Sequence, residues 1–179
     1  MKTFKEFMME GAEDDYLGNE AIDPEISKRI YGRITSNDDS TIDVEGVVDF
    51  SYMKLSQLPL KFRNVSGSFY CHSNRLTSLE GAPKHVGGNF FCSDNRLTSL
   101  EGAPANVGGD FWCDNNRLTS LEGAPANVGG DFFCTNNKLT SLEGAPVDVG
   151  GSFWCRDNKK KFTKDDVREV CNVKGIIYI

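Results

Sequence analysis

The most regular feature of the chain is a hydrophobic and polar pattern that repeats every 21 residues. Phe69, Phe90 and Phe111 share this spacing, and Cys, Asn, Leu and Val positions follow it too. The unit reads GxFxCxxN[RK]LTSLEGAPxxVG in four copies and part of a fifth. A fixed period of about 20 to 29 residues is typical of stacked units that bury their apolar residues against their neighbours. The pattern therefore predicts a solenoid rather than a closed globule.

Apolar residues also alternate within each repeat, as they do in a β-strand with one buried side. Phe90 and Cys92 point one way, and Phe91 points the other way. One repeat before the first clear copy, Val48 opens a degenerate repeat that keeps the apolar positions but loses the turn residues. We therefore expect about six parallel strands between Val48 and Cys155, more than the roughly three repeats that a stable stack needs.

The unit resembles the leucine-rich repeat, in particular the short bacterial type built on LxxLxVxxNxLxxLPxLP. The resemblance covers about residues 44–158. In one copy it rests on Phe90, Cys92, Asn95, Leu97, Leu100 and Pro104. It implies an α/β repeat, a short leucine-rich repeat solenoid of about six rungs with a parallel sheet and N- and C-terminal caps. The period is one residue longer than in the bacterial unit, and Gly87 and Gly88 precede the strand, so we expect a bend there and a different curvature.

Each repeat carries one asparagine at the same position. The column comprises Asn74, Asn95, Asn116, Asn137 and Asn158. The resemblance implies that these side chains bond to backbone groups of neighbouring rungs. A buried amide suits that role because it offers both donors and an acceptor.

The strand positions that point away from the predicted core hold large aromatic side chains. The column comprises Tyr70, Phe91, Trp112, Phe133 and Trp154. Polar and charged residues flank it, among them Asp110, Asp114, Asp131 and Arg156. In leucine-rich repeats this side of the sheet is concave, and exposed aromatics with a polar rim are typical of protein-binding surfaces. Two alternatives stay open: the rings stack only to stabilise the sheet, or they stack on sugar rings.

The candidate chemistry excludes most enzyme classes. Five cysteines occur once per repeat, without a CxxC pair, and the chain has only two histidines, so we predict no metal and no cofactor. We expect these thiols to pack in the core, with inter-rung disulfides or an iron or zinc site as alternatives. No nucleophile elbow or phosphate loop is present, and a residue type copied in every repeat seldom marks one active site. We therefore predict that the protein is not an enzyme.

Charge further narrows the choice of partner. The net charge of -6 divides into -7 for residues 1–46 (5 bases, 12 acids), -2 for 47–158 (9 bases, 11 acids) and +3 for 159–179 (6 bases, 3 acids). Duplex-binding proteins usually present a concentrated basic face, so we expect no nucleic-acid partner. No apolar run approaches the roughly 18 to 20 residues that span a bilayer, so we expect no membrane association. The repeated Arg or Lys after each column asparagine and the repeated Glu near each turn are expected to form paired exposed ladders.

The sequence divides into four segments. They are a targeting-like peptide and acidic linker at 1–17, an N-terminal cap at 18–46, the solenoid at 47–158 and a C-terminal helix-strand cap at 159–179. In the N-terminal cap we expect a helix over residues 24–34, with Ile26, Ile30 and Ile34 on one face, then a turn and a strand at 42–48.

The C-terminal cap begins with a helix signal. Thr163 and Asp166 have the spacing of a capping box, which predicts a short helix through about Val170. The tail from Gly175 to Ile179 is typical of a strand.

The first ten residues, MKTFKEFMME, resemble the capsid-targeting peptide of internal head proteins in T-even-type tailed phages. The resemblance rests on the Met-Lys-Thr start, Phe4, Glu6 with Phe7, and Glu10. In that family a prohead protease cuts after a glutamate, which here implies cleavage between Glu10 and Gly11. The repeat unit also resembles leucine-rich repeat proteins of tailed phages. The alternative is a plain amphipathic helix packed on the rest of the protein.

These features predict a non-enzymatic, protein-binding scaffold encoded by a phage. We expect it to be made in the host cytoplasm and then packaged in the virion head for delivery to the host. An unpackaged structural or interaction protein is the first alternative, and a carbohydrate-binding module is the second. The expected partner is a host or phage protein, and the sequence does not predict the oligomeric state.

Overall fold

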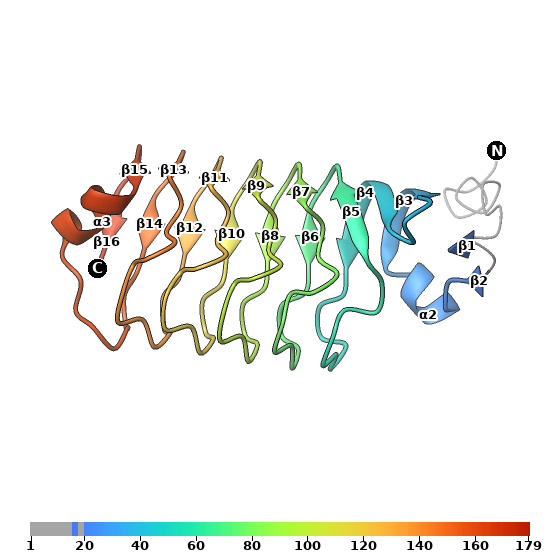
Figure 1. Ribbon diagram of the computed structural model, residues 1–179, viewed down its shortest axis with the longest axis horizontal. Helices are drawn as coiled ribbons and strands as arrows, with labels where there is room; N and C mark the ends of the chain where they lie inside the picture. The colour runs from blue at the N-terminus through green and yellow to red at the C-terminus, as the bar shows by residue number, and fades with distance from the viewer. Residues whose placement is uncertain (1–15, 18–19) are drawn as a thin grey trace, which may run out of the picture.

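The computed structural model describes residues 16–17 and 20–179 of the chain. They form a parallel-sheet β-solenoid of about seven turns, which confirms the expected repeat solenoid and adds one turn to the expected six. The rungs lie side by side along one nearly straight axis (Figure 1). Residues 1–15, including the expected cleavage site between Glu10 and Gly11, lie outside the described residues.

Each rung contributes two short strands, which build two parallel ladders in one 14-stranded sheet. The first ladder contains β5 (Phe62–Val65), β7 (His85–Val86), β9 (Asn106–Val107), β11 (Asn127–Val128), β13 (Asp148–Val149) and β15 (Asn172–Val173). The second contains β6 (Phe69–Tyr70), β8 (Phe90–Phe91), β10 (Phe111–Trp112), β12 (Phe132–Phe133), β14 (Phe153–Trp154) and β16 (Ile177–Tyr178). Both ladders start on the long strand β4 (Ile42–Asp49), which pairs with β5 and with β6.

Residues that lie 21 positions apart in the sequence pair with each other in neighbouring strands of the sheet. Phe90 pairs with Phe69 on one side and with Phe111 on the other, and all strands of the two ladders run parallel. Val48 pairs with Phe69, so the degenerate repeat is a rung of the same stack.

The glycine pair of each repeat marks the bend between the two ladders, as expected. A Cβ atom on Gly108 would lie 2.1 Å from the carbonyl oxygen of Gly87 in the preceding rung. A side chain at this position would therefore collide with the backbone of the neighbouring turn, and only glycine lets the rungs approach.

The segments that connect one rung to the next are turns without a helix. Each contains a residue in the left-handed region, such as Asn115 at φ 54°, and a glycine such as Gly102 at φ 89°. These turns interrupt any helical run, so the helical part of the expected α/β class is wrong for the repeats. The described residues hold only α2 (Pro24–Ser27) and α3 (Lys164–Val170), and neither is long and apolar enough to cross a membrane.

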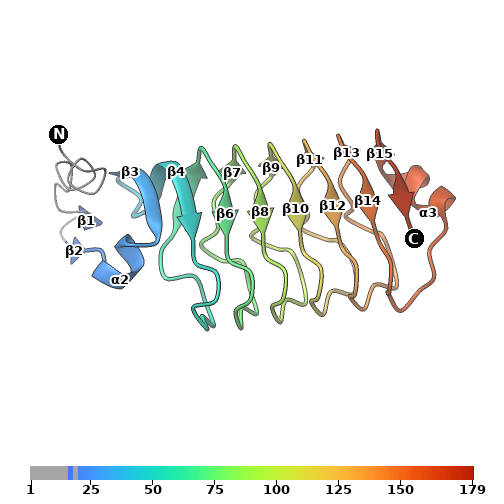
Figure 2. The same cartoon turned by 180° about the vertical axis from the view of Figure 1, so that it is seen from behind.

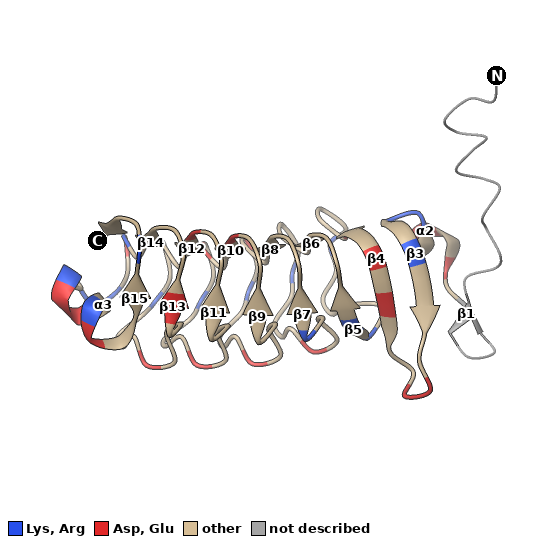
Figure 3. Cartoon of the chain, turned by 90° about the horizontal axis from the view of Figure 1, so that it is seen from above, with Lys and Arg blue, Asp and Glu red and all other residues tan. Residues whose placement is uncertain are grey.

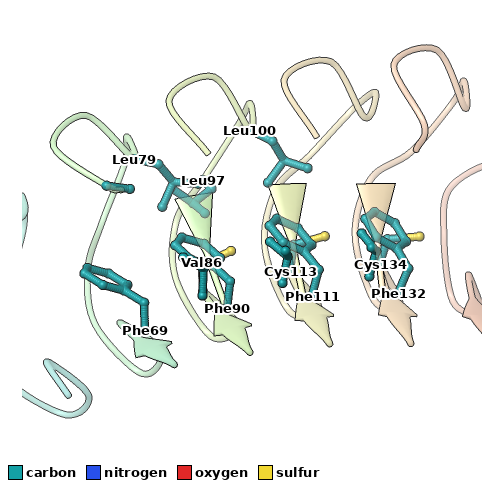
Figure 4. Packing of buried hydrophobic residues seen from close by; sticks show 14 of the residues in the cluster. Phe69, Leu79, Val86, Phe90, Leu97, Leu100, Phe111, Cys113, Phe132 and Cys134 are labelled. Atoms are coloured by element: carbon teal, nitrogen blue, oxygen red, sulfur yellow. The ribbon is translucent and has the colours of Figure 1, made fainter. Parts of the chain in front are cut away.

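The core is a set of apolar columns inside the stack (Figure 4). Phe69, Phe90, Phe111 and Phe132 are fully buried, and consecutive rings lie 5.4 to 5.5 Å apart in nearly parallel planes. Columns of buried Cys, Leu and Val residues pack around them. Each turn thus buries its apolar residues against the next, which a single repeat could not do alone.

The N-terminal segment differs from the expected helix. Helix α2 ends at Ser27, and strand β3 (Ile30–Ser36) then pairs antiparallel with β4. Isoleucines four residues apart fit one side of a strand as well as one face of a helix, and Gly32 together with β-branched neighbours favours the strand. Strand β4 runs across the expected segment boundary at residue 46. Before α2, β1 (Tyr16–Leu17) pairs with β2 (Glu20–Ala21).

The C-terminal segment contains the expected helix and forms the additional turn. Thr163 caps α3 in a complete capping box with Asp166, as the sequence predicted. Strands β15 and β16 then extend both ladders, and Tyr178 pairs with Trp154 at a spacing of 24 residues instead of 21. The helix occupies the place of a turn, which lengthens this rung and hides its period (Figure 2).

Candidate binding face

The aromatic column lies on the outward side of the second ladder, and each ring is partly exposed. Phe91 and Trp112 have ring centroids 4.5 Å apart, Trp112 and Phe133 4.6 Å, and Phe133 and Trp154 5.3 Å. Tyr178 continues the column at 3.6 Å from Trp154. Sequence reasoning missed Tyr178 because the helix in its rung shifts it out of the 21-residue period.

The rings of this column largely turn their faces toward one another. Adjacent planes are stacked at three contacts, with angles of 28°, 11° and 13°. The other two contacts, Tyr70 with Phe91 at 54° and Trp112 with Phe133 at 50°, are tilted.

Two indole groups in the column have no hydrogen-bond partner. The Nε1 atoms of Trp112 and Trp154 are buried, and nothing in the described part of the chain accepts their protons. Buried indole N–H groups usually have a partner, and leaving one unpaired costs about 1 to 3 kcal/mol. Phe91 and Phe133 occupy the same column without this cost.

A second column, directly beside the aromatic one, ties successive rungs together. The Oδ1 atom of Asn89 accepts the backbone N–H of Asp110 at 2.8 Å, and Oδ1 of Asp110 accepts that of Asp131 at 2.8 Å. Oδ1 of Asp131 accepts the N–H of Ser152 at 2.7 Å. Asp110 and Asp131, which we selected as candidate binding residues, thus each use one oxygen in the sheet.

Asp114 and Arg156 lie on the other side of the aromatic column. Asp114 accepts hydrogen bonds from Ser93 Oγ at 2.6 Å and from Asn115 Nδ2 at 2.7 Å. Burial raises the pKa of Asp114, although the Ser93 hydrogen bond opposes that change. The Arg156 guanidinium lies over the rings of Trp154, at 5.9 Å, and Tyr178, at 5.3 Å.

The asparagine column lies inside the turns rather than on the face. Asn116 Nδ2 donates to the carbonyls of Cys113 and Asp114 in its own rung and of Cys92 in the rung before. Its Oδ1 atom accepts the N–H of Leu97 at 3.0 Å. Asn74, Asn95, Asn137 and Asn158 repeat this arrangement.

The repeat cysteines are free thiols in the core. Cys113 and Cys134 donate through Sγ to the carbonyls of Phe133 and Trp154, at 3.2 and 3.3 Å. Burial raises the pKa of both thiols well above the ordinary value, so neither is poised as a nucleophile. Among the described residues, no group of three or more His, Cys, Asp or Glu side chains is arranged to hold a metal ion.

The charged columns on the turns do not pair as expected. The column after the asparagines, Arg75, Arg96, Arg117, Lys138 and Lys159, and the turn column Glu80, Glu101, Glu122 and Glu143 are exposed. The ion pairs in the described part of the chain all involve other residues. Both columns are free to point into solvent, where a pair would contribute little.

An open groove, the glycine trough, runs along the outward side of the first ladder. Its volume is about 680 Å³, and it is lined by Gly87, Gly108, Gly129 and Gly150 together with outward residues of the first ladder. These are His85, Asn106, Asn127 and Asp148, and Lys174 lies at its end. A second hollow of about 410 Å³ shares His85 and Gly87 and extends the groove toward β4. The sequence did not predict the trough. Its glycines contribute no side chains, so no pattern of functional groups pointed to it.

Comparison with known proteins returned no matching family model, no matching curated protein and no matching solved structure. The candidate site therefore rests on the geometry of the outward face.

Proposed function

We propose that this protein is a non-enzymatic, leucine-rich-repeat-like scaffold that binds another protein through the aromatic column of its sheet. The observation that carries the proposal is tryptophan at positions 112 and 154. The column accommodates phenylalanine at 91 and 133, so stacking alone does not require an indole. Each indole brings a buried, unpaired N–H at a cost that phenylalanine would avoid. Tryptophan is also the residue type most enriched at binding hot spots.

The test compares two double variants of the column. Trp112→Ala with Trp154→Ala removes both indoles, whereas Trp112→Phe with Trp154→Phe keeps a ring at each position, as in the neighbouring rungs. Affinity capture with mass spectrometry would identify proteins held by the wild type, and binding to each variant would then be measured. Thermal unfolding would report stability in parallel.

We expect the alanine variant to stay folded and lose its partner, with a stability cost of about 2 to 6 kcal/mol from the four lost ring contacts, at about 0.5 to 1.5 kcal/mol each. The phenylalanine variant should keep its stability and bind more weakly than the wild type. Full binding by the phenylalanine variant, together with collapse of the alanine variant, would instead assign the column to stacking alone.

Packaging in a phage head remains a separate hypothesis that rests on the sequence of residues 1–10. The N-terminal residue of the chain in purified particles would test it, with Gly11 as the expected result and Met1 or Lys2 as the contrary one.

A further inference from the structure

The last rung of the solenoid leaves backbone groups without a strand to receive them. In the second ladder, the N–H groups of Phe90 and Cys92 donate to carbonyls of the following rung, at 2.9 and 2.8 Å. Ile177 and Ile179 occupy these two positions in the last rung, and no strand of the described residues follows β16. Their N–H groups therefore point out of the end of the stack and form an open edge onto which another strand can pair.

The same end exposes apolar side chains. Terminal repeats of solenoids usually present a polar outer face, because no further repeat covers them. Ile176 and Ile179, on either side of Ile177, are 55% and 42% exposed. Helix α3 covers the core through the buried Val167 but leaves these two isoleucines in solvent. The C-terminal end thus combines an open strand edge with exposed apolar residues.

The opposite end of the molecule has a second open edge. Strand β3 pairs with β4 along one edge, and among the described residues no strand pairs with its other edge. The strands β1 and β2 pair with each other in a separate sheet. Tyr31 on β3 is 50% exposed. Figure 3 shows β3 near one end of the molecule and α3 at the other, so the two open edges lie far apart on one chain.

The two ends also carry opposite net charge. Residues 159–179 have six bases and three acids, a net charge of +3, and residues 22–46 have three bases and six acids, a net charge of -3. Lys164, Lys174 and Asp38 are exposed and form no ion pair within the part of the chain that the structure describes. The C-terminal end of one copy is therefore complementary in charge to the N-terminal end of another, whereas two like ends repel each other.

We propose that copies of this protein join head to tail along the solenoid axis, with β16 of one copy pairing with β3 of the next. The strands of the second ladder run parallel to β4, and β3 runs antiparallel to β4. A second copy on the same axis therefore presents β3 antiparallel to β16, an arrangement that forms a regular ladder. The contact joins two different surfaces, so a straight stack does not close and grows by further copies.

The inference goes beyond the proposed function, because it uses the two ends of the solenoid and not the aromatic column. Analytical ultracentrifugation of the full chain at low salt would measure self-association at protein concentrations up to about 1 mM. We expect the average mass to rise with concentration above that of one chain and to fall as salt is added, because salt screens exposed charges. The mass of a single chain at all concentrations would overturn the inference.

Charge reversal at either end tests the head-to-tail arrangement. Lys164→Glu with Lys174→Glu makes the C-terminal segment acidic, and Glu25→Lys with Asp38→Lys makes the N-terminal segment basic. Each variant alone then has ends of like charge, so we expect its self-association to weaken about tenfold or more. An equimolar mixture of the two variants again offers ends of opposite charge, and association should return. Persistent association of either variant alone, or no recovery in the mixture, would contradict head-to-tail joining.

Two further variants separate the ends from the rest of the molecule and strand pairing from charge. Arg96→Glu with Arg117→Glu reverses the same number of charges on turns in the middle of the stack, and it should associate as the wild type does. Ile179→Pro removes one outward N–H from the last rung and should weaken association without changing any charge. Circular dichroism would confirm that each variant is folded. Equal weakening in the mid-stack control, or full association of Ile179→Pro, would overturn pairing through the open edges.

Discussion

The buried asparagine of each rung joins two turns of the solenoid. Asn116 is 8% exposed and makes three donor contacts and one acceptor contact with the backbone. In Asn116→Ala, the Leu97 N–H would lose its partner inside the core, whereas the Cys92 carbonyl would keep the Asn95 amide as a donor at 3.1 Å. Because an unpaired buried polar group costs about 1 to 3 kcal/mol, we expect a loss of about 3 kcal/mol in the free energy of unfolding. Urea denaturation would measure it.

The last asparagine of the column offers a matched comparison. Asn158 makes the same set of bonds but lies closer to solvent, where water can replace them. Asn158→Ala should therefore cost less than Asn116→Ala. Equal losses at the two positions, or no loss at Asn116, would contradict a role that depends on burial.

At the scale of elements, helix α3 depends on a capping box that is sensitive to acid. Asp166 accepts hydrogen bonds from the Thr163 side chain and backbone and from Lys160, which lowers its pKa to about 2 from 3.8. A carboxylate with a lowered folded pKa stabilises the folded state above its ordinary pKa and loses that contribution as pH falls. We expect the contribution to be full above about pH 4 and to disappear toward pH 2.

Asp166→Asn tests this assignment, because the amide oxygen can still accept from Thr163 but carries no charge. The variant should be less stable than the wild type at neutral pH, and the difference should shrink between about pH 4 and pH 2. Thermal unfolding across this range would show it. A difference that stays constant with pH would mean that the Asp166 charge does not contribute.

The sequence predicted best those strands whose residues recur every 21 positions. Phe90 and Cys92 occupy the core, and Phe91 lies on the outward face. The same alternation recurs in each rung, so the prediction does not depend on a single copy that could match by chance. The N-terminal segment has no such copies, and the spacing of Ile30 and Ile34 fits a strand or a helix until the pairing with β4 selects the strand. The glycine trough could not be predicted because it depends on the three-dimensional arrangement of the two ladders.

At the scale of the whole molecule, a stack of equivalent turns should tolerate the loss of one complete turn. Deleting residues 106–126 removes 21 residues, joins Ala105 to Asn127, and recreates the Ala-Asn junction found in the native repeats. Strands β9 and β10 would be lost, and β7 and β8 would pair with β11 and β12 in the native register. The stability of such arrays is approximately a sum over repeats and their interfaces. We therefore expect a folded, shorter solenoid with an unchanged circular dichroism signature per residue and a lower melting temperature.

A shorter deletion of residues 106–115 supplies the contrast, because it removes about half a turn. It would join Ala105, which precedes β9, directly to Asn116, which follows β10. Asn116 and the leucines after it would then no longer align with their columns. We expect this variant to unfold or aggregate, although it loses fewer residues than the first. Folding of the shorter deletion with failure of the full-turn deletion would show that long-range contacts, rather than contacts between neighbouring rungs, hold the solenoid together.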